Sequence, residues 1–176
     1  MLEGRSVNLR IVEREDLPLL ADWSNNPAFF GDFVWLPQQS KAEWERKYDN
    51  LASDTKWFFI ERKDGTKIGT MFHFPRGSAL EIGYALIPSG RGKGYGTEAV
   101  KIIVDYLFLS KEIVRVQAVT DTDNSASQKV LQKAGFRKEG TIRKSAFIRG
   151  EWRDGCIYSI LREEWKKPGA LNITPK

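Results

Sequence analysis

Apolar side chains recur along the chain with two spacings, and each spacing predicts one kind of element. Alternating stretches, and stretches rich in β-branched or aromatic residues, predict strands at 5–12, 55–62, 66–74, 79–87, 113–120, 136–149 and 152–161. Apolar residues on one helical face predict helices at 13–26, 40–52, 96–110 and 123–135. Residues 27–37 form an aromatic loop bounded by prolines, and Ser40 with Glu43 predicts a capping box for the second helix.

The order of these elements predicts the fold class. One strand, two helices, three strands, a helix, a strand, a helix and two strands imply an α/β (α+β) protein with one mixed sheet and helices on both faces. Neither an internal repeat nor a low-complexity linker divides the sequence, so we expect a single domain spanning 1–176. Its core should cover about 5–165, with 166–176 as a flexible tail.

Composition narrows the classes of function. The chain is 41% hydrophobic and 29% charged, as in an ordinary globular protein, and its apolar runs are too short for a membrane span. The first ten residues lack an apolar signal core, so we expect a cytoplasmic protein without a membrane partner. A single cysteine, Cys156, excludes an internal disulfide and a cysteine-based zinc cluster. The single histidine, His73, lies between two phenylalanines, which favours a strand position over a metal or triad role, and we expect no metal.

Charge is distributed unevenly along the chain. Residues 1–88 carry a net charge of −2, whereas residues 89–176 carry +7. A basic half suits a small polyanionic ligand or a nucleic acid. We regard nucleic acid as the weaker alternative, because the chain has no long lysine and arginine tract interleaved with aromatic residues.

The basic half begins at a glycine-rich loop between a predicted strand and a predicted helix. Residues 88–99 read PSGRGKGYGTEA, with glycines at alternate positions from Gly90 to Gly96. Closely spaced glycines let successive backbone N–H groups converge on one anion at a helix N-terminus, where the helix dipole favours negative charge. No glycine is followed by Lys-Ser or Lys-Thr, which excludes the phosphate loop of ATPases.

A dinucleotide site is one alternative for this loop. Residues 94–99 satisfy G-x-G-x-x-A, and Asp121 ends the next strand at the place of a ribose-binding acid. Two features count against an NAD-dependent oxidoreductase. Six residues separate the strand from Gly94 where a tight turn is needed, and that strand alternates where a central parallel strand should be apolar throughout.

Two segments carry a resemblance to a known family. Arg91-Gly92-Lys93-Gly94-Tyr95-Gly96 resembles the Q/R-x-x-G-x-G/A pyrophosphate loop of the GNAT superfamily of N-acetyltransferases, and residues 124–136 resemble its N-x-x-[AS] helix ending in K-x-G-F. The resemblance covers residues 5–162 and looks closest to the RimJ/RimL-like branch, which acetylates ribosomal-protein N-termini. It implies about seven mostly antiparallel strands flanked by four helices, with acetyl-CoA as co-substrate. It also implies a primary amine acceptor, expected to be a protein N-terminus, with polyamines, other small amines and aminoglycosides as alternatives.

The resemblance also implies roles for individual residues. The residues implied to bind the coenzyme are Leu86, Ile87, Arg91, Gly92, Lys93, Gly94, Tyr95, Gly96, Thr97, Asn124 and Ser127. Among them, the backbone of Leu86 and Ile87 would pair with the pantetheine amides like an added strand.

Acetyl transfer from a thioester needs no protein nucleophile, because the amine attacks directly. Glu81 occupies the strand position of the family's general base, and an ordinary solvated strand acid is the alternative. Many family members carry a tyrosine that protonates the thiolate, and here that position is Leu131. Ser127 is the implied substitute acid, and the missing tyrosine leaves a non-catalytic acyl-CoA-binding sensor open.

The acceptor site is expected around the aromatic loop. Phe33, Trp35 and Tyr84 are the candidate acceptor-binding residues, and the alternative use of the loop aromatics is packing on the sheet or a homodimer contact. Asp32 and Glu43 are candidates to neutralise a cationic acceptor.

Overall fold

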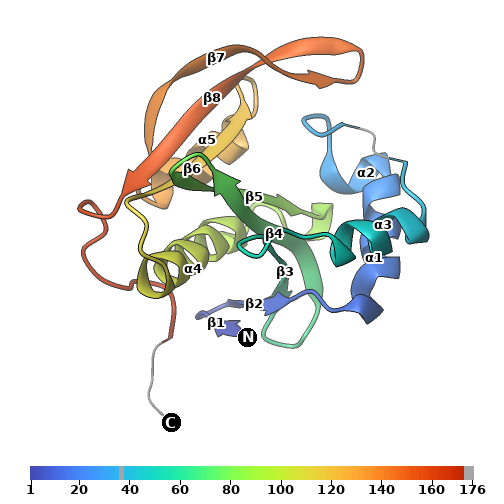
Figure 1. Ribbon diagram of the computed structural model, residues 1–176, viewed down its shortest axis with the longest axis horizontal. Helices are drawn as coiled ribbons and strands as arrows, with labels where there is room; N and C mark the ends of the chain where they lie inside the picture. Colours follow the sequence, from blue (N-terminus) through green and yellow to red (C-terminus); the bar gives the residue numbers. More distant parts are fainter. Residues whose placement is uncertain (36–37, 173–176) are drawn as a thin grey trace.

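The computed structural model describes residues 1–35 and 38–172 and shows one twisted sheet with helices on both faces (Figure 1). The strands are β1 (Leu2–Glu3), β2 (Val7–Ile11), β3 (Lys56–Arg62), β4 (Lys67–Arg76), β5 (Ala79–Leu86), β6 (Arg115–Asp121), β7 (Arg137–Ile148) and β8 (Glu151–Leu161). The α-helices are α1 (Leu17–Asn25), α2 (Pro27–Phe30), α3 (Lys41–Asp49), α4 (Tyr95–Ser110) and α5 (Ser125–Lys133). Two 3₁₀ turns are η1 (Arg14–Asp16) and η2 (Pro88–Gly90).

The sheet has the order β1-β2-β3-β4-β5-β6-β8-β7, and every neighbouring pair is antiparallel except β5 and β6. The predicted mixed sheet is therefore confirmed, with eight strands rather than seven. The additional strand is the two-residue β1, and the additional short helix α2 lies within the predicted aromatic loop. Both are too short to leave a periodic hydrophobic pattern.

Alternation along the strands divides the core between the two faces of the sheet. On β3, Phe58 and Ile60 pack in the larger cluster with α4, whereas Phe59 packs in a second cluster with α1. Figure 1 accordingly shows α4 and α1 on opposite sides of the sheet. The same alternation on β5 places Leu80 and Ile82 in the α4 cluster, so Glu81 lies on the opposite face.

The two parallel strands stay together for only two residue pairs. Leu80 pairs with Val116 and Glu81 pairs with Gln117, and the pairing of β5 with β6 ends there. β5 remains paired with β4 as far as Leu86, and β6 remains paired with β8 as far as Asp121. The sheet therefore splits between β5 and β6, which gives a ligand access between two strands.

Several local predictions can be compared directly with the structure. Ser40 N donates to Glu43 Oε2 at 2.7 Å and Glu43 N to Ser40 Oγ at 3.3 Å, which confirms the capping box of α3. His73 lies on β4, which confirms the strand position that its flanks predicted, and its side chain is fully buried. None of the described helices has the length and apolar character that crossing a membrane requires.

The chain after β8 returns to α4. The buried carboxylate of Asp105 accepts hydrogen bonds from the backbone N–H groups of Gly169, Ala170 and Leu171 at 2.8–3.0 Å. Trp165 Nε1 donates to the same side chain at 2.8 Å. The described part of the segment expected to be a flexible tail is thus held against α4.

Candidate active site

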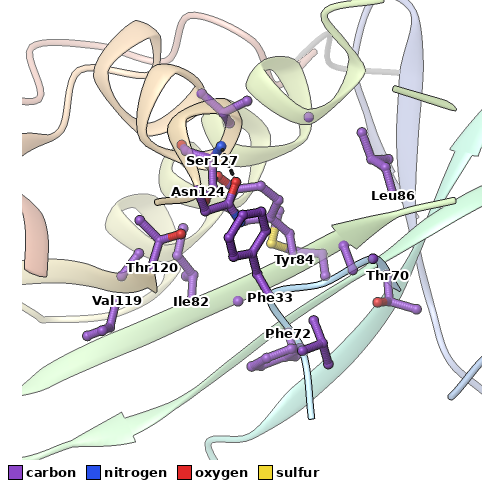
Figure 2. Close-up of a pocket in the computed structure, with 18 of the residues that line it drawn as sticks. Phe33, Thr70, Phe72, Ile82, Tyr84, Leu86, Val119, Thr120, Asn124 and Ser127 are labelled. Atoms are coloured by element: carbon purple, nitrogen blue, oxygen red, sulfur yellow. Dashed lines mark hydrogen bonds between the residues drawn. The ribbon is translucent and has the colours of Figure 1, made fainter. Parts of the chain in front are cut away.

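A cavity of about 1120 Å³ opens where β5 and β6 separate. One side is formed by the glycine loop and the N-terminal ends of α4 and α5, and the other by the aromatic loop and the exposed faces of β3 and β4. Figure 2 shows Asn124 and Ser127 on α5 next to Tyr84, with Phe33 and Phe72 lower in the view. The cavity therefore joins the expected coenzyme residues to the expected acceptor residues.

Two glycines of the glycine loop adopt a left-handed backbone conformation. Gly92 has φ +73° and Gly94, the N-cap of α4, has φ +82°, a region that other residues adopt only with strain. A Cβ on either glycine would meet no atom within 4 Å. The left-handed backbone conformation is therefore the reason for glycine at these two positions, and crowding by neighbouring protein atoms is not. The space in front of the helix is free of protein atoms. The first N–H groups of α4 have no partner within the helix and point toward this space.

The two cations of the loop bind backbone carbonyls. Arg91 Nε donates to Leu86 O at 2.9 Å, and its Nη2 donates to Phe29 O at 2.5 Å. Lys93 Nζ donates to Ser89 O at 3.1 Å. Arg91 therefore ties the glycine loop to both β5 and α2, a role that the sequence did not indicate.

Two backbone groups at the end of β5 already have hydrogen-bond partners within the protein. Ile87 N donates to Ile68 O at 3.0 Å, and Leu86 O accepts the Arg91 hydrogen bond. These contacts use two of the backbone groups at the position where the family resemblance places the pantetheine arm. The edge of β5 that faces β6 has no strand pairing beyond Glu81.

Three polar side chains meet where α5 faces β5. Asn124 is the N-cap of α5, and its Oδ1 accepts from Ser127 N at 3.0 Å, the dashed bond in Figure 2. Ser127 Oγ lies 2.9 Å from Tyr84 Oη. Burial raises the pKa of Tyr84 to about 12, although the hydrogen bond to Ser127 lowers it, so the phenol keeps its proton at neutral pH. The structure thus places Tyr84 beside the expected coenzyme residue Ser127, in the cavity that Phe33 and Trp35 also line.

The family's tyrosine position has a different function in this chain. Leu131 is fully buried and packs in the α4 cluster, so it contributes to the core. Tyr84 comes from β5 instead of α5, and its hydroxyl is the phenol that lies beside Ser127. The sequence contained the signal for this arrangement, because strand alternation places Tyr84 on the same face as Ile82.

Glu81 lies on the other face, at the point where the strands separate. Gln117 Nε2 donates to Glu81 Oε2 at 2.9 Å. Arg115 Nε donates to Gln117 Oε1 at 3.1 Å, which fixes the orientation of the Gln117 amide with its NH₂ group toward Glu81. Arg76 Nε is 3.9 Å from the Glu81 carboxylate, whose side chain is 17% exposed. Glu81 lines the cavity, so it is a carboxylate held in a cleft.

Aromatic side chains cover the sheet beside Glu81. Phe74 pairs with Glu81 across β4 and β5, and Phe72 pairs with Gly83. A Cβ on Gly83 would lie 2.1 Å from the Phe72 ring, so the glycine lets this ring lie flat on β5. The aromatic residues lining the cavity are Phe33, Trp35, Trp44, Trp57, Phe58, Phe72, Phe74 and Tyr84. Phe72 and Phe74 were not among the expected site residues. Alternation along the 66–74 strand places them on one face, and the register of β4 with β5 makes this the face of Glu81.

Two arginines of the β7–β8 hairpin hold the aromatic loop. Arg149 Nη1 is 2.8 Å from Asp32 Oδ1, and its Nη2 donates to Gly31 O at 2.8 Å. The Arg153 guanidinium lies 5.6 Å from the centre of the Phe33 ring. The hairpin accordingly arches toward the end of the molecule that carries α2 (Figure 1).

Three acids considered in the sequence have partners within the protein. Asp32 is paired with Arg149, and Glu43 caps α3, where the backbone N–H of Ser40 lowers the pKa of the Glu43 carboxyl. Asp32 lines the cavity with its side chain 83% exposed, whereas Glu43 is not among the residues that line the described cavity. Asp121 Oδ2 lies 2.6 Å from Arg153 Nε, so the acid required by the dinucleotide alternative is already paired.

Comparison with known proteins identifies the family of the chain. The family model described as an acetyltransferase (GNAT) domain matches residues 6–137. The probable N-acetyltransferase YjcK of Bacillus subtilis (strain 168) is 34% identical over 93% of this chain and 98% of its own length. The spermidine N(1)-acetyltransferase of Escherichia coli (strain K12) is 28% identical over 99% of this chain and 98% of its own length.

Solved structures with the same fold include two complexes with CoA. Spermidine N-acetyltransferase from Vibrio cholerae in complex with CoA and spermine has a TM-score of 0.79 at 22% identity, covering 90% of this chain and 97% of that chain. RimL, the ribosomal L7/L12 alpha-N-protein acetyltransferase, has a TM-score of 0.77 at 20% identity, covering 90% of this chain and 95% of that chain. At these identities the likeness concerns the fold.

Proposed function

This chain belongs to the GNAT acetyltransferase family and uses acetyl-CoA, and we propose that it acetylates a protein N-terminal amine with Glu81 as general base. The observation that carries the proposal is the separation of β5 from β6 immediately after Glu81 and Gln117. This separation creates one cavity, with the N-terminus of α4 on one side and the Glu81 carboxylate on the other. The helix N-terminus suits a pyrophosphate, and the carboxylate suits an ammonium group.

On the coenzyme side, the glycine loop and α4 would hold the pyrophosphate through backbone N–H groups. The residues proposed for this binding are Arg91, Gly92, Lys93, Gly94, Tyr95, Gly96 and Thr97, with Leu86, Ile87, Asn124 and Ser127 along the pantetheine arm. For Arg91 and Lys93 to reach a phosphate, each would exchange a backbone carbonyl for a phosphate oxygen. The charge-assisted bond to phosphate is the stronger of the two.

On the acceptor side, Glu81 takes a proton from the substrate ammonium and leaves a neutral amine. The amine nitrogen attacks the thioester carbon, so that a C–N bond forms, the C–S bond breaks and the nitrogen releases its second proton to the bulk. Ser127 donates its hydroxyl proton to the departing thiolate and recovers one from the bulk through Tyr84, its hydrogen-bond partner at 2.9 Å. The products are the acetylated amine, CoA and one released proton.

The acceptor is assigned on two grounds. The RimJ/RimL-like pattern of the glycine loop and of α5 supports a protein N-terminus, and the structural likeness to RimL is in keeping with it. Polyamines are the second candidate, because the spermidine acetyltransferase of Escherichia coli matches almost the whole chain.

The test is release of CoA thiol from acetyl-CoA with and without a primary amine. Thermal unfolding is measured with acetyl-CoA and with NAD at the same concentration. Acetyl-CoA at about 100 times its dissociation constant should raise Tm by about 5–10 °C, and NAD should leave Tm unchanged. Amine-dependent thiol release with that rise supports the proposal. Acetyl-CoA binding without thiol release from any amine would instead favour a sensor.

A further inference from the structure

From the charge and position of the last strand of the sheet, we infer that β7 binds an acidic segment of the acceptor protein, a few residues beyond the acetylated N-terminus. The inference rests on the proposed acetylation of a protein N-terminus and narrows its substrate class. The partner is a polypeptide whose first residue enters the cavity and whose following residues carry carboxylates.

β7 forms an edge of the sheet beside the cavity. It is the last strand in the sheet order and pairs only with β8, so its outer edge has no strand partner among the described residues (Figure 1). Ser145, Ala146 and Ile148 of β7 line the cavity, as do residues 153–155 of β8. The cavity wall therefore continues onto β7, and a chain that leaves the cavity on this side meets that strand.

Positive charge is in excess on this part of the sheet. The β7–β8 hairpin carries six cations and three acids. Lys138, Arg143 and Lys144 are exposed, and none of them forms an ion pair with a carboxylate of the described residues. Glu139, the acid on β7, forms its bidentate contact with Arg115 of β6. β7 therefore presents cations that are available to carboxylates of a partner.

Two of these cations lie next to the cavity wall. The register of β7 with β8 shifts at residues 143–145, which form a bulge. Arg143 and Lys144 directly precede Ser145, which lines the cavity. Lys144 N donates to Asp154 Oδ1 at 2.8 Å, a bond that fixes the bulge against β8. An acceptor chain that extends from the cavity would pass both cations.

The spacing of the strands indicates which acceptor residues would reach β7. β6 and β8 lie between β5 and β7 in the sheet order. At about 4.8 Å per strand, β7 is about 14 Å from Glu81 across the sheet, which is the length of about four extended residues. With the amine at Glu81, carboxylates from about the fifth residue onward would meet Arg143 and Lys144. Exposed charges of this kind act mainly on association, so their effect should appear in KM and not in kcat.

The experiment compares three decapeptides that share their first four residues. The remaining six alternate serine with glutamate, glutamine or lysine, and the tetrapeptide amide of the shared residues is the reference that is too short to reach β7. We expect kcat/KM for the glutamate peptide to exceed that for the glutamine peptide by about fivefold or more, with the lysine peptide lowest and the differences shrinking as salt is added. Equal values for the three decapeptides would overturn the inference while leaving acetyl transfer intact. The cations of β7 would then serve only to prevent pairing with another sheet edge.

Two arginine variants reverse one charge each at opposite edges of the sheet. Arg143→Glu should reduce the preference for the glutamate peptide severalfold without changing kcat/KM for the tetrapeptide. Arg5→Glu is the matched control, because Arg5 is exposed in the turn between β1 and β2, at the edge farthest from β7, and this variant should keep the preference. An equal loss in both variants would overturn the inference, since net charge and not β7 would then decide.

Two further outcomes separate the inference from its alternatives. Single-stranded poly(U) that binds the wild type but not Arg143→Glu, with no preference for the glutamate peptide, would overturn the inference in favour of a nucleic-acid surface. Acetylation of none of the four peptides, with acetyl-CoA still bound, would contradict the proposed protein acceptor itself, and the inference would fall with it.

Discussion

Gln117 Nε2 lies 2.9 Å from Glu81 Oε2, across the last residue pair before β5 and β6 separate. Arg115 holds the other end of the Gln117 amide, and Glu139 in turn forms a bidentate contact with Arg115 at 2.5 and 2.7 Å. A series of polar contacts across β6 and β7 thus ends on the carboxylate proposed as the base. Such a series fixes the direction of the carboxylate, which a base needs in order to meet the amine.

Replacing Gln117 by leucine should therefore impair turnover without weakening coenzyme binding. We expect kcat to fall by about tenfold or more, because Glu81 would lose the bond that orients it. The measurement is steady-state kinetics together with the thermal shift given by acetyl-CoA. Loss of that shift along with activity would mean that Gln117 supports the fold of the cavity rather than the base.

The glycine loop allows a matched pair of variants. Gly94 and Gly65 both have φ +82°, and a Cβ on either meets no atom within 4 Å, but Gly65 lies in the turn between β3 and β4. Gly94→Val and Gly65→Val should each cost roughly 1–3 kcal/mol of stability, since both force a branched residue into the left-handed region. We expect only Gly94→Val to lose the thermal shift with acetyl-CoA. An equal shift in both variants would remove the loop from the coenzyme site.

Ser127 and Tyr84 should behave as one unit. Because Ser127 Oγ and Tyr84 Oη share a hydrogen bond, Ser127→Ala, Tyr84→Phe and the double variant should have non-additive effects on kcat. If the pair protonates the thiolate, we expect a loss of about tenfold or more in Ser127→Ala and little further loss in the double variant. Additive losses, or none, would show that the two hydroxyls do not act together on the leaving group.

His73 gives a prediction for stability against pH. Burial lowers its pKa to about 4, an effect that Lys111 reinforces and Asp54 opposes, and neither ring nitrogen has a partner among the described residues. The unfolded chain binds the proton more tightly, so stability should be complete above about pH 6.5 and decline as the pH falls toward 4. His73→Leu should flatten this part of the decline, measured as Tm between pH 7 and pH 4. An identical decline in the variant would assign it to other groups.

The sequence predicted the scaffold better than the contacts around the cavity, for a physical reason. Strands and helices depend on neighbours in the chain, so periodicity reveals them. The contact of Arg149 with Asp32 joins residues 117 positions apart, and nothing local signals it. Tyr84 is intermediate: alternation on β5 indicated its face, but only the packing of α5 brings Ser127 to its hydroxyl.

The most direct test of the account is the amount of N-acetylated amine and free CoA formed by the wild-type protein and by Glu81→Gln. We predict equal amounts of both products from the wild type, and a rate lower by about 10²–10⁴ in Glu81→Gln, because proton removal by a positioned base contributes that much. The variant should keep the thermal shift with acetyl-CoA, since Glu81 lies on the opposite face of β5 from Tyr84 and Ser127. A wild-type rate in Glu81→Gln would contradict the central claim that Glu81 is the base.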